Sequence, residues 1–328
     1  MKTPTETCEN VIWYGPRMEI ARGIAILLVT LGHSEPIKTA LPSMKEFIYS
    51  FHMPLFFFMS GFFSVRFISE GLVSYVLPRI KRLLIPYITI SFSFFIIKFV
   101  VPSMVNRPVD PARFLLDIFV YPLNNPALFL WFLYVIILMK LFTAFLRFIP
   151  VWLMFILAAL PALTGMADYD FAAFSHLGKY MIFFTAGLWV ANYKKSFFAF
   201  ITGHRKALLW TCSFLFFYML NVTMTLKLPS LDVLVAFAGT FMVISMCFTW
   251  HDTLKFSFLK FAGRYSLEIY LLQYYFIFPV YYLMLKQDID PICIIPFTFA
   301  AGIAGPIIII KYFLPRCRWA ALCLGSKI

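Results

Sequence analysis

Residues 292–313 read ICIIPFTFAAGIAGPIIIIKYF and carry one charged side chain, Lys311, near the end of the stretch. A helix needs about 20 mostly apolar residues to cross the roughly 30 Å of hydrocarbon in a bilayer, so this stretch is long enough to span a membrane. Other stretches of the chain meet the same criterion, although residues 151–165 are short and contain Pro161. The predicted segments are residues 18–34, 47–67, 84–101, 127–146, 151–165, 178–193, 207–226, 231–250, 266–285 and 292–313.

The composition of the whole chain also indicates a membrane protein. Of its 328 residues, 62% are hydrophobic and 13% are charged, whereas a soluble globular protein has roughly 45–50% apolar and about 25% charged residues. The apolar runs are continuous rather than alternating, which favours helices over a barrel because a helix satisfies its own backbone groups in lipid. The sequence therefore predicts an all-α polytopic membrane protein with about ten transmembrane helices.

The net charge of +13 does not indicate a nucleic-acid partner. The Lys and Arg residues lie between apolar runs, where they set the orientation of helices and meet anionic lipid headgroups. The alternate loops that include both ends of the chain carry the larger share of these residues, so both termini are expected to be cytoplasmic. This divides the chain into a cytoplasmic N-terminal segment (1–16), a membrane domain (17–315) and a cytoplasmic tail (316–328).

Three ionisable side chains, Glu19, Arg22 and His33, lie in the first predicted segment. Each costs at least about 2.5–3.5 kcal/mol in hydrocarbon, so it requires a partner or a water-filled cavity. Arg22 and His33 are about three helical turns plus 20° apart, so they share one face and lie about 16 Å apart along the axis. Glu19 is expected to pair with Arg22. This face is therefore predicted to line a polar central cavity, although an ion pair at the cytoplasmic end of the helix also explains Glu19 and Arg22.

A second histidine lies near the start of the next apolar segment. The sequence SFHMP at residues 50–54 contains His52, and the short link between the two segments makes the two helices neighbours. With both termini cytoplasmic, His33 and His52 are expected at the outer ends of their helices. The two imidazoles could therefore flank one cavity. For His33 taken alone, a hydrogen-bonded interfacial histidine is the simpler interpretation.

Several motifs follow one another in order along the chain. The motif Glu19-x-x-Arg22-Gly-Ile-Ala precedes His33, and it is followed by FHMPLFF (51–57) with SGF (60–62), R-x-KRLLIPY (79–87), LWFLY (130–134) and GRYSLEIYLL (263–272). In this order and spacing the chain resembles the acyltransferase 3 family of integral-membrane O-acyltransferases, especially its sugar O-acetylase branch. The resemblance implies transfer of an acyl group, usually acetyl, from acyl-coenzyme A to a hydroxyl of a cell-surface glycan or lipid-linked sugar. It also implies a location in the bacterial inner (plasma) membrane.

One position departs from this resemblance. Many relatives in this branch place a histidine after the Ile-Tyr-Leu run, where this chain has Gln273. A glutamine can hydrogen-bond a substrate but cannot exchange a proton near neutral pH. His33, which matches the Arg-x10-His pattern, is therefore the residue expected to be essential.

The residues suit the chemistry that the resemblance implies. An alcohol needs a base to take its proton, and a neutral imidazole, with a reference pKa of about 6.5, can do so near neutral pH. We assign this role to His33; a transient acyl-histidine is the alternative. Arg22 is expected to orient the thioester or to stabilise developing charge, with Glu19 as its partner.

A cationic cluster is predicted to bind the donor. Arg79, Lys81 and Arg82 precede the third segment at its cytoplasmic end, and Tyr87 follows them in the same motif. Coenzyme A carries phosphates, which guanidinium and ammonium groups bind. These four residues are therefore predicted to bind acyl-CoA (acetyl-CoA). The alternative for the three cations is that they only set the topology.

Polar and aromatic residues within the apolar segments are assigned to the acceptor. Trp131 and Tyr134 could stack on a sugar or line the acyl channel, although core or interfacial positions are commoner for such residues. Glu268 and Gln273 are not freely tolerated by hydrocarbon, so they are predicted to face the cavity. The predicted substrate-binding residues are His52, Ser60, Trp131, Tyr134, Glu268 and Gln273.

The competing class of function is a secondary transporter or flippase for a glycan or a small metabolite, because intramembrane Glu, Arg and His also form relays. Transporters often contain repeats with paired broken helices, and the two halves of this sequence show no such correspondence. The six cysteines have no C-x-x-C spacing, and no metal-ligand motif occurs, so no metal is expected. The expected partners are acyl-CoA, a glycan or lipid-linked sugar, and membrane lipids.

Overall fold

Helices make up most of the part of the chain that the structure describes. The computed structural model describes residues 4–65, 77–101, 108–165, 171–226, 228–250 and 256–326. Of these described residues 84% are helical, and they form no strand. The predicted all-α class is therefore confirmed. The chain divides into two compact units, the first comprising Met1–Met59 and Tyr193–Phe313, and the second Ser60–Asn192 and Leu314–Ile328.

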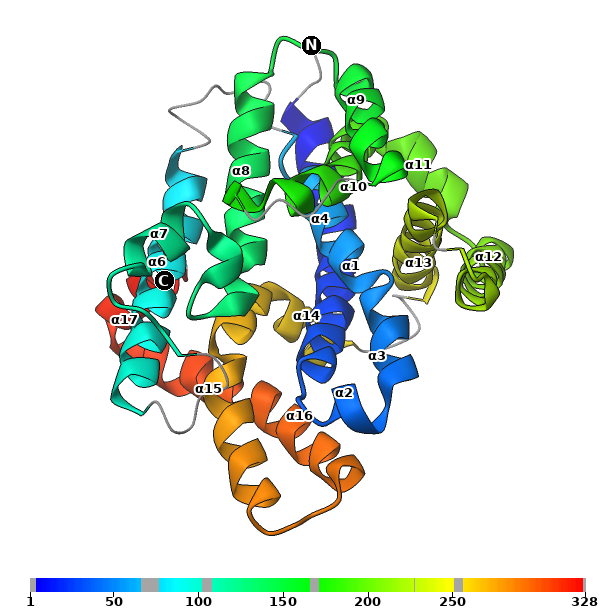
Figure 1. Ribbon diagram of the computed structural model, residues 1–328. Coiled ribbons are helices and arrows are strands. Elements are labelled where there is room, and N and C mark those ends of the chain that lie inside the picture. Colours follow the sequence, from blue (N-terminus) through cyan, green and yellow to red (C-terminus); the bar gives the residue numbers. More distant parts are fainter. Residues whose placement is uncertain are drawn as a thin grey trace. The chain divides into compact units, whose positions relative to one another are not determined.

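The first unit is built largely from pairs of packed helices. Helix α1 packs along α14, α12 along α13, and α15 along α16 (Figure 1). The helices of this unit are α1 (Pro4–Gly32), α2 (Ile37–Ala40), α3 (Pro42–Tyr49), most of α4 (His52–Phe62), α11 (Lys194–Ile201), α12 (His204–Thr223), α13 (Pro229–Trp250), α14 (Ser257–Arg264), α15 (Ser266–Leu285) and α16 (Pro291–Ile308), which continues into a π-helical turn, Ile309–Phe313.

The second unit is built around α6, α8, α9 and α10. Helix α9 packs along α10, α8 contacts both α6 and α10, and the C-terminal α17 lies on α6. The helices of this unit are α6 (Leu77–Val100), α7 (Phe114–Phe119), η3 (Pro122–Asn124), η4 (Leu128–Leu130), α8 (Trp131–Phe145), α9 (Val151–Thr164), η5 (Phe171–Ala173), α10 (Phe174–Asn192), η7 (Leu314–Arg316) and α17 (Arg318–Cys323).

Five helices in the described part of the chain are long and apolar enough to cross a membrane. They are Leu77–Val100, Leu128–Phe145, His204–Thr223, Pro229–Trp250 and Pro291–Arg316. These helices correspond to the predicted segments 84–101, 127–146, 207–226, 231–250 and 292–313. The predicted segments 47–67 and 151–165 contain shorter helices of 11 and 14 residues. Several apolar helices, together with the family described below, make this an integral membrane protein.

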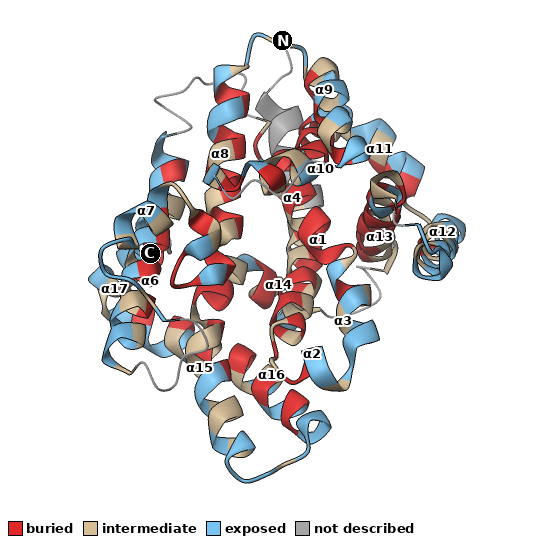
Figure 2. Cartoon of the chain, viewed as in Figure 1, coloured by how far each residue is buried: buried red, intermediate tan, exposed pale blue. Residues whose placement is uncertain are grey.

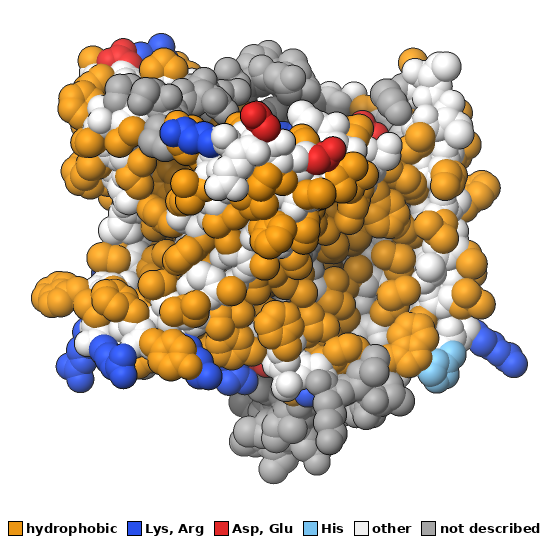
Figure 3. Space-filling view, turned by 90° about the horizontal axis from the view of Figure 1, so that it is seen from below, with side chains coloured by type: hydrophobic (Ala, Val, Ile, Leu, Met, Phe, Trp, Pro, Cys, Tyr) orange, Lys and Arg blue, Asp and Glu red, His pale blue; other side chains and the backbone are white. Residues whose placement is uncertain are grey.

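Burial separates helices that face lipid from helices that face protein. In the most apolar stretch of α12 only 11% of residues are buried, whereas in α13 the value is 67%, and Figure 2 shows the same contrast between the two helices. The outer face of α12 carries large apolar side chains such as Leu208 and Phe216, each 64% exposed. Hydrophobic side chains make up most of the surface seen in Figure 3. A continuous apolar surface of this kind is unusual in water and suits contact with lipid.

The start of α16 shows how local sequence sets a helix boundary. The Asp290 carboxylate accepts a hydrogen bond from the Ile292 N–H at 2.8 Å, and Pro291 occupies the first turn. An acidic cap followed by proline is a favourable helix start, because the cap satisfies a backbone donor and proline has none to satisfy. The helix then continues through Pro296 and Pro306, which membrane helices tolerate.

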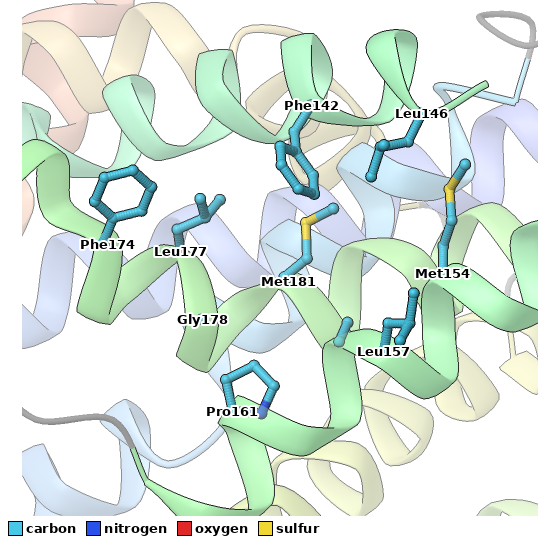
Figure 4. A pocket seen from close by; sticks show the side chains of 10 residues that line it. Phe142, Leu146, Met154, Leu157, Pro161, Phe174, Leu177, Gly178 and Met181 are labelled. Atoms are coloured by element: carbon cyan, nitrogen blue, oxygen red, sulfur yellow. The ribbon is translucent and has the colours of Figure 1, made fainter. Parts of the chain in front are cut away.

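The second unit contains an apolar cavity of about 330 Å³ between α8, α9 and α10 (Figure 4). None of the predicted site residues lines it. Its walls are side chains suited to hydrocarbon rather than to a phosphate or a sugar. The lining residues are Phe142, Leu146, Met154, Leu157, Ala158, Pro161, Phe174, Leu177, Gly178 and Met181.

Candidate active site

His33 lies directly after the last turn of α1, where groups from α15 meet it. Its backbone N–H still donates to Val29 at 2.9 Å, so the residue continues the helical turn. The side-chain amide of Gln273 lies 3.2 Å from the Nδ1 atom of His33, and the Tyr274 ring centroid lies 5.3 Å from the imidazole centroid. Gln273 is fully buried, while His33 keeps some exposed surface. The imidazole is therefore held by a neighbour that cannot move freely.

The residues next to His33 tie the end of α1 to α16. The Ser34 and Thr298 hydroxyls lie 2.6 Å apart, and both side chains are fully buried. One turn earlier, Thr30 packs against Gly302, where a Cβ atom would lie 2.7 Å from the Thr30 methyl group. Because the chain is fixed on both sides of His33, the position of its ring is set by the packing of three helices.

His52 is buried at the start of α4, and its tautomer is defined. Its Nδ1 atom lies 2.8 Å from the Ile48 carbonyl oxygen. A carbonyl can only accept, so Nδ1 donates its hydrogen and Nε2 is the unprotonated nitrogen of the neutral ring. The Tyr49 ring lies between the two histidines, with its centroid 4.8 Å from that of His52 and 6.4 Å from that of His33. The structure thus brings both predicted histidines against one tyrosine.

Glu19 lies near the middle of α1 and contacts α14. Its carboxylate lies 3.5 Å from the Arg264 guanidinium. The sequence predicted Arg22 as the partner of Glu19, and the structure adds a partner from a segment far along the chain. Arg264 is 66% exposed, so this ion pair contributes little to stability by itself. Glu268, the other predicted acidic residue, is buried in the first turn of α15.

Two glycines of the sequence motifs explain how α1 and α14 pack. A Cβ atom on Gly263 would collide with the Glu19 carbonyl oxygen, and one on Gly23 would collide with the Leu259 carbonyl oxygen. The two backbones are therefore in direct contact, which only small residues allow. This contact places Arg264, the next residue, beside Glu19.

We expect Gly263→Ala to destabilise the protein by about 1–3 kcal/mol, because the added methyl must displace backbone rather than a flexible side chain. The measurement is the melting temperature of the detergent-solubilised protein. Gly15→Ala is the matched control within α1, since a Cβ atom there meets nothing within 4 Å. Equal melting temperatures for the two variants would contradict the close packing.

In the second unit, the predicted donor-binding cations lie in the first turns of α6. Arg79 and Lys81 are exposed. The Arg82 Nε–H donates to the Gly325 carbonyl oxygen at 2.6 Å, and the Thr89 hydroxyl donates to the Cys323 carbonyl oxygen at 2.9 Å. The C-terminal segment thus fastens to α6 through Arg82, while Arg79 and Lys81 face solvent.

Tyr87 belongs to a buried hydrogen-bond network. Its hydroxyl donates to the Ile118 carbonyl oxygen at 2.6 Å and accepts from the Asn125 amide at 3.2 Å. The Asn125 amide also donates to the Ser91 hydroxyl at 2.8 Å. Tyr87 is 1% exposed, and its hydroxyl fastens residues 118–125 to α6. Its role in donor binding stays a prediction.

We expect Tyr87→Phe to lower the free energy of unfolding by about 1–3 kcal/mol, because buried hydrogen-bonding groups of Ile118 and Asn125 lose their partner. Tyr134→Phe is the matched control. Its hydroxyl donates to the Phe119 carbonyl at 2.8 Å at an exposed position, where water can replace it. Thermal unfolding measures both variants. A loss of acetyl-CoA affinity without a loss of stability would instead support donor binding by Tyr87.

A buried lysine lies near the predicted residue Ser60. The Lys140 ammonium donates to the Ser64 hydroxyl at 2.7 Å, and that hydroxyl donates to the Ser60 carbonyl at 2.7 Å. Lys140 is 8% exposed and lies within the apolar α8. No role was predicted for Lys140, although a charge inside an apolar run is itself a signal of function.

Trp131 forms an aromatic cluster with two residues of α10. Its ring stacks on Tyr180 with centroids 5.7 Å apart and an interplanar angle of 26°, and the His176 ring lies 4.5 Å away. His176 and Tyr180 were not among the predicted site residues. No periodicity links α8 to α10, so only the structure shows that these rings meet.

Comparison with known proteins identifies the family. Residues 16–311 match the model of the acyltransferase 3 family, which describes an acyltransferase domain. The chain therefore belongs to this family and is a membrane acyltransferase, as the motifs indicated. A search of the curated proteins found no match. A search of the solved structures found none either.

Proposed function

We propose that this acyltransferase moves an acyl group, in the simplest case acetyl, from acyl-CoA to a hydroxyl of a cell-surface glycan or a lipid-linked sugar, with His33 as the general base. The family match over residues 16–311 supports the transfer of an acyl group. The observation that carries the assignment is the imidazole of His33, which the buried Gln273 contacts at the C-terminal end of α1.

The reaction balances without a metal. His33 takes the proton of the acceptor hydroxyl, and the alkoxide oxygen attacks the thioester carbon, so that a C–O bond forms and the C–S bond breaks. The coenzyme A thiolate leaves and regains a proton, which the protonated imidazole can supply. In the alternative route the imidazole attacks first, and an acyl-histidine then passes the group to the hydroxyl. Arg22, accompanied by Glu19, stabilises negative charge on the thioester oxygen.

The donor is bound by cations at the cytoplasmic end of α6. Arg79 and Lys81 are exposed, and Arg82 is held in place by its bond to Gly325. These residues can pair with the phosphates of a coenzyme that is made in the cytoplasm. Acetyl-CoA is therefore the donor to test first.

The acceptor contacts polar and aromatic residues of the membrane domain. His52 offers an unprotonated nitrogen next to Tyr49, and Trp131 offers an aromatic face that a sugar ring can stack on. The other residues proposed for the acceptor are Ser60, Tyr134 and Glu268. A neutral sugar hydroxyl suits these hydrogen-bonding groups.

The proposed architecture is about ten transmembrane helices around a polar central cavity, in the bacterial inner membrane. Both termini are cytoplasmic, with residues 1–16 and 316–328 flanking the membrane domain at 17–315. The proposal rests on the Lys and Arg distribution. In this orientation the proposed donor-binding cations lie on the cytoplasmic side of the membrane, where acyl-CoA is made.

The test is transfer of labelled acetyl from acetyl-CoA to glycans extracted from cells that lack the protein, catalysed by the purified protein in detergent. We expect labelled ester on a glycan fraction and free coenzyme A in equal amount. Mass spectrometry of surface glycans from cells with and without the gene identifies the sugar. Movement of a glycan across vesicle membranes without ester formation would favour a transporter or flippase instead.

A further inference from the structure

The amide of Gln273 decides which nitrogen of His33 is available as a base. It lies 3.2 Å from Nδ1 of the imidazole. In the structure the amide nitrogen faces the ring, and the amide oxygen is buried without a hydrogen-bond partner among the described residues. The oxygen and nitrogen of a glutamine amide exchange places on rotation by about 180°, so two pairings with the imidazole are available.

The two pairings leave different nitrogens unprotonated. When the amide nitrogen donates to the imidazole Nδ1, the neutral ring carries its hydrogen on Nε2 and its lone pair is occupied by Gln273. Neither nitrogen of the ring then has a free lone pair that could accept a proton. When the amide oxygen accepts from Nδ1–H, Nε2 has a free lone pair on the side of the ring away from Gln273. Only the second pairing leaves His33 able to take a proton from an alcohol.

The surroundings of Gln273 suit a residue that holds its neighbour still. Gln273 lies in α15, fully buried, and one turn later Ile277 packs against Gly302 of α16, where a Cβ atom would lie 2.9 Å from it. Tyr274 covers one side of the imidazole, with ring centroids 5.3 Å apart. The backbone that carries the amide is therefore fixed.

We infer that Gln273 is the positioning residue of His33: its amide oxygen accepts the Nδ1 hydrogen and so directs the unprotonated Nε2 toward the acceptor hydroxyl. The inference rests on the proposed function, because it requires His33 to act as the base. In enzymes that activate a hydroxyl through histidine, a third group commonly orients the imidazole in this way. Here that group is a neutral amide rather than a carboxylate.

The test compares Gln273→Met and Gln273→Glu in the full-length protein, with acetyl-CoA as donor and extracted glycan as acceptor. Gln273→Met keeps the volume but loses the accepting oxygen. We expect kcat to fall about 10- to 100-fold with KM unchanged, because the hydrogen bond strengthens as the imidazole becomes charged. Gln287→Met is the matched control, since Gln287 is exposed in the turn after α15 and its kcat should be unchanged.

Gln273→Glu keeps an accepting oxygen and should retain most of kcat. A carboxylate beside the ring favours its protonated form, so the acidic limb of the kcat/KM profile should move to higher pH. An unmoved acidic limb would show that the group at position 273 does not act on the base of the reaction. Both variants must keep the melting temperature of the wild type within the range of the Gln287→Met control.

Three outcomes would overturn the inference or its basis. Full kcat in Gln273→Met would show that His33 needs no positioning by the amide. A raised KM with unchanged kcat would make Gln273 a substrate contact instead. If His33→Ala is inactive while Gln273→Met is fully active, only the positioning role is wrong; if His33→Ala is also fully active, the proposed function is wrong.

Discussion

His33→Ala is expected to lower acyl transfer by about 10²- to 10⁴-fold while leaving the affinity for acetyl-CoA unchanged, because a positioned base contributes a factor of this size. The proposed donor-binding residues do not include His33, so binding and chemistry should separate. Isothermal titration with acetyl-CoA measures donor affinity, and release of free coenzyme A in the presence of glycan measures the rate of acyl transfer. This variant tests the proposed function directly.

The control must exclude a loss of structure at the end of α1. His33→Gln keeps a polar side chain that can still meet Gln273 but cannot act as a base, so it should be as inactive as His33→Ala. His204→Ala removes an exposed histidine whose ring lies 5.7 Å from Trp250 and should leave transfer unchanged. A His33→Ala protein with the wild-type melting temperature and full transfer would rule out the general base.

The sequence predicted the class of protein well because the signals for it are local. Apolar runs of sufficient length occur within single segments, such as residues 292–313, and the corresponding helix Pro291–Arg316 meets the length and composition of a membrane span. The motif residues Gly23 and Gly263 were part of the resemblance to the family, which is confirmed. Their packing role was not predictable, because it depends on two helices far apart in sequence.

The neighbours of the candidate site were harder to predict for the same reason. Gln273 was assigned to the acceptor, but no pattern shows that its amide lies beside His33, which is 240 positions away. Tyr87 was assigned to the donor from its place in a basic motif. In the structure its hydroxyl contacts Ile118 and Asn125, which lie in a segment without periodicity, so these partners could not be predicted. The sequence indicates which polar residues are unusual in a membrane, and only packing shows what each one contacts.

Replacing the cations of α6 is expected to have a large effect on acetyl-CoA affinity. We expect Arg79→Gln, Lys81→Gln and Arg82→Gln together to weaken acetyl-CoA binding about 100-fold, since three contacts to phosphate at about 1 kcal/mol each sum to that factor. The affinity that is left should depend less on salt, because fewer charged contacts remain to be screened. Titration with acetyl-CoA at low and high salt measures both effects.

Two further variants separate donor binding from topology. Arg79→Gln with Lys81→Gln preserves the bond of Arg82 to Gly325, so it tests the exposed cations without loosening the C-terminal segment. The matched control replaces three exposed cations of the first unit, Lys195, Arg205 and Lys206, by glutamine. Both sets of cations are predicted to be cytoplasmic. If they only set the orientation of the protein in the membrane, replacing either set should have the same effect on acetyl-CoA affinity. Weaker acetyl-CoA binding only in the α6 variants supports a phosphate site, whereas unchanged affinity in both sets leaves Arg79, Lys81 and Arg82 as determinants of orientation alone.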